Sequence, residues 1–200
     1  MSRPKPPKPA SAQNAVEQFL QQAKQLPKRS DNSSAKGRLI FALDATASRQ
    51  PSWDRASHLQ AEMFTASQGI GGLHIQLCYY RGFHEFYLSR WCQQSDELLR
   101  VMSRVQCLGG HTQIARTLDH CLRESRQQPL RAVVFIGDAI EENVDALCNK
   151  AGQLGLLGTA LFLFQEGRDA RVQSTFQQMA RLSKGAYARL DESSSSQLAD

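Results

Sequence analysis

The sequence has no long apolar run and no closely paired cysteines. Its apolar stretches, such as 160–164, are far shorter than the roughly 20 residues of a membrane-spanning helix, and its first residues lack the apolar core of a signal peptide. The five cysteines are an odd number without a C-x-x-C pair, so we expect neither a disulfide framework nor a zinc site. These absences predict a cytoplasmic protein with no membrane contact, in which Cys78, Cys121 and Cys148 are small core residues.

Basic charge is scarce outside the N-terminal segment. The chain has 24 Lys or Arg and 19 Asp or Glu, and its first 38 residues hold eight of the former and two of the latter. The remainder is therefore close to neutral, with 16 basic and 17 acidic residues. Because aromatic residues are not interleaved with the basic ones, we expect only weak, salt-dependent binding of nucleic acid through this segment.

Composition divides the chain into a tail and a folded domain. The tail, 1–36, opens with prolines and lysines, continues with a short amphipathic pattern at 11–26, and ends in a polar linker. The amphipathic segment either docks on the domain, binds a partner or forms only in part. We expect 37–200 to be one domain, with an incomplete last helix that begins in the segment 193–200.

Strand and helix patterns alternate from residue 37 onward. Continuous apolar runs such as 38–44 and 131–138 are typical of strands buried on both faces of a parallel sheet. We therefore expect an α/β three-layer sandwich of Rossmann-like type, with a mostly parallel central sheet and one antiparallel edge strand at 83–90. Strands are expected at 38–44, 72–82, 83–90, 131–138, 158–167 and 186–191, and helices at 52–68, 95–105, within 109–125, at 141–155 and at 169–185.

Two of the predicted strands end in aspartate, Asp44 and Asp138, at the edge of the sheet where ligands bind in this fold class. Thr46 and Ser48 follow Asp44 at every second position, so an extended turn would point these side chains the same way. Thr112 begins a helix at the same edge. Two carboxylates and three hydroxyls suit a hard cation, with Mg²⁺ the first choice and Mn²⁺ or Ca²⁺ the alternatives.

Helix capping is the other role open to these residues. Ser48 or Ser52 would cap the helix that follows, and Thr112 is a good N-cap for its own helix. Asp138, with the two glutamates after it, would complement a helix dipole. Capping is compatible with metal binding, but it does not explain why all five groups should meet at one edge.

Several neighbouring residues have two interpretations. Arg49 either contacts an incoming carboxylate or, as we favour, is a solvated loop arginine. Trp53 belongs either to a contact surface or to the edge of the core, and His111 could crowd or contact the site. We interpret His84 as a surface turn residue and the remaining histidines as structural: His58, His74 and His120.

Three segments resemble the parts of the metal-ion-dependent adhesion site (MIDAS) of the von Willebrand factor A domain family: "DATAS", "TQIARTL" after a Gly-Gly turn, and "VVFIGD". The resemblance spans about 37–191 and is to intracellular domains of the bacterial type. It implies that a Glu or Asp of a partner protein completes the metal's shell. It also implies direct hydroxyl ligands from Thr46, Ser48 and Thr112, with Asp44 and Asp138 acting largely through bound water.

Three features depart from the family pattern, and one of them is the extra His111 in the turn before Thr112. Thr46 stands in place of a serine and keeps the hydroxyl, and Ala139 stands in place of a common glycine. The resemblance implies recognition without turnover. The leading hypothesis is therefore a metal-dependent protein-binding module that is not an enzyme.

A phosphatase is the alternative function. Asp44, at the end of the first predicted strand, resembles the nucleophile of haloacid-dehalogenase-type phosphatases, which works beside Mg²⁺. That chemistry needs a second acid two residues on, where this chain has Thr46, and a lysine that the predicted loops from 44 to 138 lack. A nucleotide site is also disfavoured, because the glycines at 69–72 precede a strand instead of opening a helix.

Overall fold

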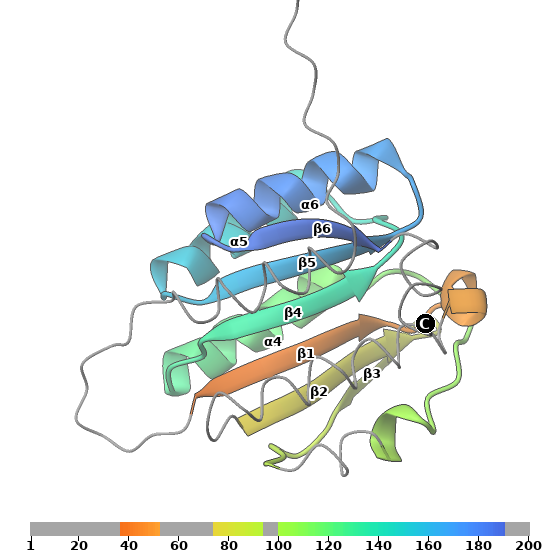
Figure 1. Ribbon diagram of the computed structural model, residues 1–200, viewed down its shortest axis with the longest axis horizontal. Helices are drawn as coiled ribbons and strands as arrows, with labels where there is room; N and C mark the ends of the chain where they lie inside the picture. Colours follow the sequence, from red (N-terminus) through yellow and green to blue (C-terminus); the bar gives the residue numbers. More distant parts are fainter. Residues whose placement is uncertain (1–36, 53–73, 94–99, 191–200) are drawn as a thin grey trace, which may run out of the picture.

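A computed structural model describes residues 37–52, 74–93 and 100–190, which form a six-stranded sheet with helices against it (Figure 1). The strand order is β3-β2-β1-β4-β5-β6. The strands are β1 (Arg38–Asp44), β2 (His74–Arg81), β3 (Glu85–Leu88), β4 (Ala132–Gly137), β5 (Ala160–Glu166) and β6 (Ala186–Leu190), and the helices are the 3-10 helix η1 (Ala47–Ser52), α4 (Ile114–Gln127), α5 (Val144–Leu156) and α6 (Ala170–Leu182).

Some predicted segments lie outside the described residues. They are the tail at 1–36, nearly all of the helix expected at 52–68, and the incomplete helix expected after residue 191. Of the helix expected at 95–105, only the end is described, and it is helical at 100–102.

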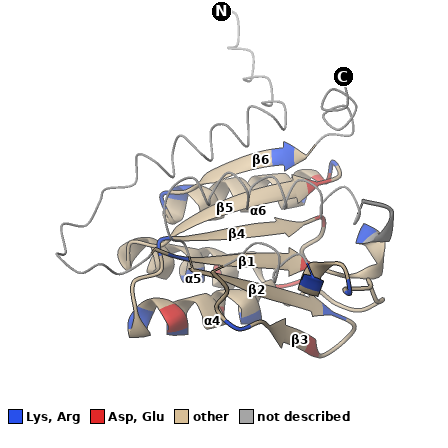
Figure 2. Cartoon of the chain, turned by 60° about the horizontal axis from the view of Figure 1, so that its bottom comes forward, with Lys and Arg blue, Asp and Glu red and all other residues tan. Residues whose placement is uncertain are grey.

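The prediction of a mostly parallel sheet with one antiparallel edge strand is confirmed. β3 pairs antiparallel with β2, and the remaining pairs of neighbouring strands are parallel. Gly82 turns the chain between β2 and β3 with φ of 59°, a conformation that glycine adopts without strain. Charged residues lie at or next to the strand ends (Figure 2). The strands β1, β4 and β5 are buried throughout.

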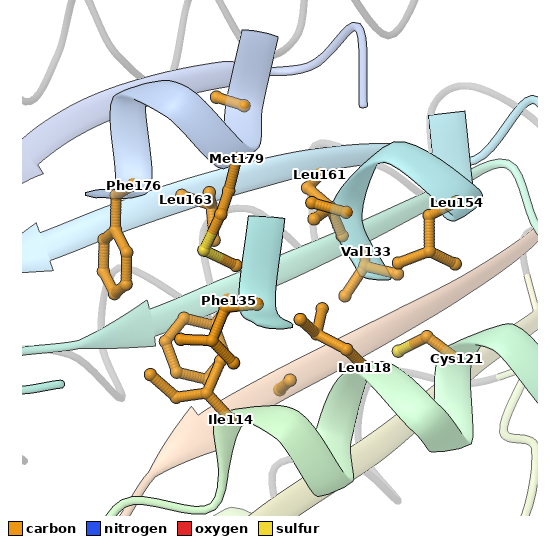
Figure 3. Close-up of a cluster of buried hydrophobic side chains, with 14 of the residues drawn as sticks. Ile114, Leu118, Cys121, Val133, Phe135, Leu154, Leu161, Leu163, Phe176 and Met179 are labelled. Carbon is orange, nitrogen blue, oxygen red and sulfur yellow. The ribbon is translucent and has the colours of Figure 1, made fainter. Parts of the chain in front are cut away.

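The helices α4, α5 and α6 cover one face of the sheet (Figure 1). Their apolar side chains interdigitate with those of the strands in a single buried cluster (Figure 3), where Phe135 meets Phe176 edge to face with ring centroids 5.7 Å apart. Burying one large apolar side chain of this kind contributes about 1.5–3 kcal/mol. The prediction that Cys78, Cys121 and Cys148 are core residues is confirmed, because all three are buried. None of the five cysteines forms a disulfide.

The other face of the sheet is buried as well. Along β1, Ile40 and Ala42 belong to the helix-covered cluster, while Leu39, Phe41 and Leu43 belong to a second cluster on the opposite face. This alternation follows from the two-residue period of a strand. Because both faces of β1 are apolar and buried, its acidic residue, Asp44, lies at its carboxyl end.

The sheet brings distant parts of the chain together at its carboxyl edge. β1 and β4 are parallel neighbours, with Leu43 opposite Ile136, so Asp44 and Asp138 leave the sheet side by side. The loop before α4 docks on the same edge, because the Leu108 amide donates to the Ala45 carbonyl at 3.0 Å. This loop carries the sequence from 106 to 113 past the ends of β1 and β2.

Candidate metal site at the carboxyl edge of the sheet

Asp44 is fully buried at the end of β1, and both of its carboxylate oxygens accept hydrogen bonds. Oδ1 accepts from the Thr46 amide at 2.8 Å, and Oδ2 accepts from the Tyr80 hydroxyl at 3.0 Å. Burial raises the pKa of Asp44 and the nearby charge of Asp138 raises it further, whereas the bonds from Thr46 and the charge of Arg49 lower it. These bonds fix the orientation of the carboxylate from two sides.

Thr46 and Ser48 lie together, with their hydroxyl oxygens 3.1 Å apart. The expectation that an extended turn aligns them is wrong. The chain instead tightens into η1 from Ala47, and the Arg49 amide donates to the Thr46 carbonyl at 3.1 Å. The two hydroxyls meet because the backbone coils here, and the two-residue alternation of a strand does not apply.

Thr112 is held by the loop that precedes α5. Its hydroxyl donates to Glu142 Oε2 and accepts from the Glu141 amide at 3.1 Å, while its own amide donates to Glu141 Oε2 at 2.9 Å. The expectation that Thr112 caps α4 is wrong, since the N-cap position falls on Gln113, which makes no side-chain capping bond. The first turn of α4 is capped from a distance by Glu142, whose Oε1 accepts from the Ala115 amide at 3.1 Å.

Asp138 follows β4, and its Oδ1 is buried with no hydrogen-bond donor among the described residues. The dipole interpretation of this residue is wrong, because α5 begins only at Val144 and is capped by Asn143, whose Oδ1 accepts from the Ala146 amide at 2.9 Å. A buried carboxylate oxygen without a partner costs free energy. A cation beside Asp44 would remove that cost.

Four charged side chains near the carboxyl edge of the sheet act on the thiol of Cys107. Burial raises the pKa of Cys107 to about 11, and the charges of Arg49, Asp44, Glu166 and Asp138 all act on that thiol. The side chains predicted to bind a cation at this edge offer only oxygen atoms, which hard cations prefer. No group of three or more His, Cys, Asp or Glu suited to a metal occurs in the described part of the chain, and the predicted set contains only two such residues.

Sequence reasoning missed Tyr80 and misread Arg49. Tyr80 is fully buried opposite Asp44 in the register of β2 and β1, although nothing in its local sequence marks it. Arg49 is not solvated: its side chain is fully buried and forms an ion pair with Glu166 at 2.8 Å. One signal could have found this pair, because Glu166 ends an apolar strand in the same way as Asp44 does.

The described histidines differ in their exposure and in their contacts. His84 is an exposed turn residue, as expected, and His120 is buried with Nε2 2.7 Å from Gln76 Oε1. His111 is exposed, and its Nδ1 lies 3.0 Å from Glu141 Oε2, so it contacts the loop that holds Thr112. The other two candidates, Trp53 and His58, lie outside the described residues.

Comparison with known proteins gives structural matches alone. No protein-family model matches the sequence, and no curated protein matches it. The SpRpn10 VWA domain superposes with a TM-score of 0.59 at 10% identity, over 78% of this chain and 87% of that one. Manganese-loaded TRAP protein of Plasmodium vivax superposes with a TM-score of 0.60 at 12% identity, over 82% and 72% of the two chains.

A third match, proximal thread matrix protein 1 of the mussel byssus with a zinc-occupied MIDAS motif, has a TM-score of 0.60 at 11% identity and covers 82% of this chain and 44% of that one. At such identities the likeness concerns the backbone. In the described part, no helix has both the length and the apolar character needed to cross a membrane. The strand order, the single antiparallel edge and these matches agree: the chain has the von Willebrand factor A fold.

Proposed function

We propose that this domain is a metal-dependent protein-binding module of the cytoplasm, similar to bacterial intracellular domains of the same fold. A divalent cation, Mg²⁺ in the first place and otherwise Mn²⁺ or Ca²⁺, binds at the carboxyl edge of the sheet, and a Glu or Asp of a partner protein completes its shell. The residues that hold the cation are Asp44, Thr46, Ser48, Thr112 and Asp138.

One observation carries this proposal. Asp138 Oδ1 is buried without a hydrogen-bond donor among the described residues, beside the buried carboxylate of Asp44. Two neighbouring carboxylates, that of Asp44 fully buried and that of Asp138 half-buried, repel each other, and a cation between them would offset that repulsion. The donor set is all oxygen, which fits Mg²⁺, Mn²⁺ and Ca²⁺.

The carboxylates and the hydroxyls of the site have different roles in binding the cation. Both oxygens of Asp44 already accept hydrogen bonds from Thr46 and Tyr80, which suits a carboxylate that reaches the cation through water. The hydroxyls of Thr46 and Ser48 are neutral ligands within 3.1 Å of each other. Neutral ligands leave the cation with positive charge, and that charge is what would attract a partner's carboxylate.

The phosphatase alternative loses support. A phosphoryl-transfer site needs a positive side chain that can reach the phosphate. The arginine nearest to Asp44 in the sequence is Arg49, and it is buried and bound to Glu166. We therefore expect no hydrolysis of generic phosphate esters above the blank rate in the presence of Mg²⁺.

Metal titration of Asp138→Ala tests the proposal. Wild-type protein should bind one Mn²⁺ in calorimetry and in Mn²⁺ electron paramagnetic resonance, and Asp138→Ala should not. Because Oδ1 has no partner to lose, the free energy of unfolding of the metal-free variant should stay the same or rise. Asp169→Ala, which removes the N-cap of α6, is the control that should lose stability but keep the metal.

The partner is tested by affinity capture from the native cell. The captured proteins should be lost when EDTA is added and when the bait is Asp138→Ala. Adding excess Mg²⁺ to the EDTA-treated wild-type bait should restore them. Capture of the same proteins with EDTA and with Asp138→Ala as from untreated wild type would refute metal-dependent binding. The absence of one-to-one Mn²⁺ binding by the wild type would refute the metal site itself.

A further inference from the structure

We propose that Glu142 is a positioning residue for the metal site: it holds the hydroxyl of Thr112 so that one lone pair is directed to the cation. This inference rests on the proposed metal site. It adds a residue that is outside the three segments of the resemblance, on the loop between β4 and α5.

The argument starts from what one hydroxyl can do. A threonine hydroxyl has one proton to donate and two lone pairs that accept. The proton of Thr112 goes to Glu142 Oε2, and one lone pair accepts from the Glu141 amide at 3.1 Å. One lone pair is left, so these two bonds fix both the rotamer of Thr112 and the direction of its remaining acceptor.

Glu142 is itself held in place. While Oε2 accepts from Thr112, Oε1 accepts from the Ala115 amide in the first turn of α4 at 3.1 Å. A carboxylate at a helix N-terminus is stabilised by the unpaired amides there and by the helix dipole. Glu142 therefore has a fixed position from which it can orient Thr112, and an uncharged side chain would accept the hydroxyl proton less strongly.

A purely structural role is the competing explanation, because Glu142 also caps α4. Another helix, α6, shows the effect of capping alone. Asp169 caps α6 through bonds from the Arg171 and Val172 amides, and among the described residues its side chain bonds to no threonine hydroxyl. Replacement of Asp169 should therefore cost stability alone, about 1 kcal/mol, whereas replacement of Glu142 should also weaken the metal.

The neighbouring Glu141 supplies a charge-matched control. Its Oε2 accepts from the Thr112 amide at 2.9 Å and lies 3.0 Å from His111 Nδ1, but its side chain does not accept from the Thr112 hydroxyl. Glu141→Gln and Glu142→Gln remove the same charge from adjacent positions. Because Glu142 also caps α4, a difference between them in metal affinity reports the bond to the Thr112 hydroxyl only when the rotamer of Thr112 changes with it.

Two measurements on the full chain test the inference. In Mn²⁺ calorimetry, Glu142→Gln should bind about 10–100-fold more weakly than wild type, the usual effect of losing an outer-shell partner. Glu141→Gln should stay within about threefold, as expected for a screened surface charge. In the metal-free protein, three-bond NMR couplings to the Thr112 methyl should show one χ1 rotamer in wild type and in Glu141→Gln, and averaged rotamers in Glu142→Gln.

The outcomes separate this inference from the metal proposal. Equal Mn²⁺ affinities for the two glutamine variants would overturn the positioning role while leaving the metal site in place. A single Thr112 rotamer in Glu142→Gln would also overturn it. If wild type binds no Mn²⁺, the metal proposal fails and this inference fails with it, whatever the rotamer of Thr112.

Discussion

The guanidinium of Arg49 forms a bidentate ion pair with the carboxylate of Glu166, in which Nη2 donates to Oε1 at 2.8 Å and Nε donates to Oε2 at 3.1 Å. The same guanidinium donates from Nη1 to the carbonyl oxygen of Asp44 at 2.6 Å. The loop after β1 is thereby tied to the end of β5, although β4 lies between the two strands. This buried ion pair therefore connects the segment that carries Thr46 and Ser48 to β5.

Breaking this buried ion pair should lower the free energy of unfolding substantially. Removing one partner of a buried ion pair leaves an uncompensated charge, which typically costs about 3–5 kcal/mol. We expect Glu166→Gln and Arg49→Met to lower the free energy of unfolding in urea by this amount. The exposed pair of Arg81 and Glu85 is the control, because Glu85→Gln should cost no more than about 1 kcal/mol. Similar losses for buried and exposed pairs would contradict the prediction.

Tyr80→Phe should destabilise the fold through Asp44. The variant removes the hydroxyl that donates to Asp44 Oδ2 at 3.0 Å and leaves a buried carboxylate oxygen without that bond. Such a loss typically costs about 1–3 kcal/mol. Urea unfolding of metal-free protein measures the loss, with Tyr87→Phe at the exposed edge strand as the matched control. A Tyr80→Phe variant as stable as the control would show that the bond contributes nothing.

Two adjacent glycines should differ sharply in their tolerance of a methyl group. A Cβ on Gly110 would lie 1.9 Å from the Gly82 carbonyl oxygen, whereas a Cβ on Gly109 would meet nothing within 4 Å. Gly110→Ala should therefore push the loop that carries Thr112 off the β2–β3 hairpin, lowering both the thermal midpoint and the affinity for Mn²⁺. Gly109→Ala should preserve both. Equal behaviour of the two variants would mean that the loop is not docked as described.

Much of the fold was predictable because several of its strands are continuous apolar stretches of sequence. β1 spans Arg38–Asp44, as expected, and β4 and β5 begin and end within two residues of their predicted bounds. The edge strand β3 was recognisable because a hairpin needs only a short turn, here built on Gly82. Local patterns of this kind depend on neighbours in the sequence, so the sequence alone can predict them.

The surroundings of the site were not predictable, because they depend on neighbours in space. The bonds of Asp44 to Tyr80, and of Thr112 to Glu142, follow from strand order, register and loop docking, which no local pattern encodes. Arg49 was expected in solvent because loop arginines usually are, and only the placement of β5 supplies the carboxylate that allows its burial. The predicted metal ligands themselves remain predictions until a metal is titrated.

The stability of the domain should fall as the pH drops below about 6.5, through His120. Burial lowers the pKa of this imidazole below its ordinary value of 6.5, and the charges of Arg123 and Arg38 lower it further against the opposing effect of Glu124. The unfolded chain then binds the proton more readily than the folded one, so stability is complete above the unfolded pKa and is lost as pH falls below it. Between pH 6.5 and 5.5 the loss is at most about 1.4 kcal/mol.

His120→Gln tests this directly, since glutamine can still bond to Gln76 but does not titrate. Urea unfolding at pH 7.5 and 5.5 should show a smaller loss of stability for His120→Gln than for wild type. If His120→Gln loses as much stability on acidification as wild type does, other groups carry the pH dependence and the neutral, buried imidazole is not its source.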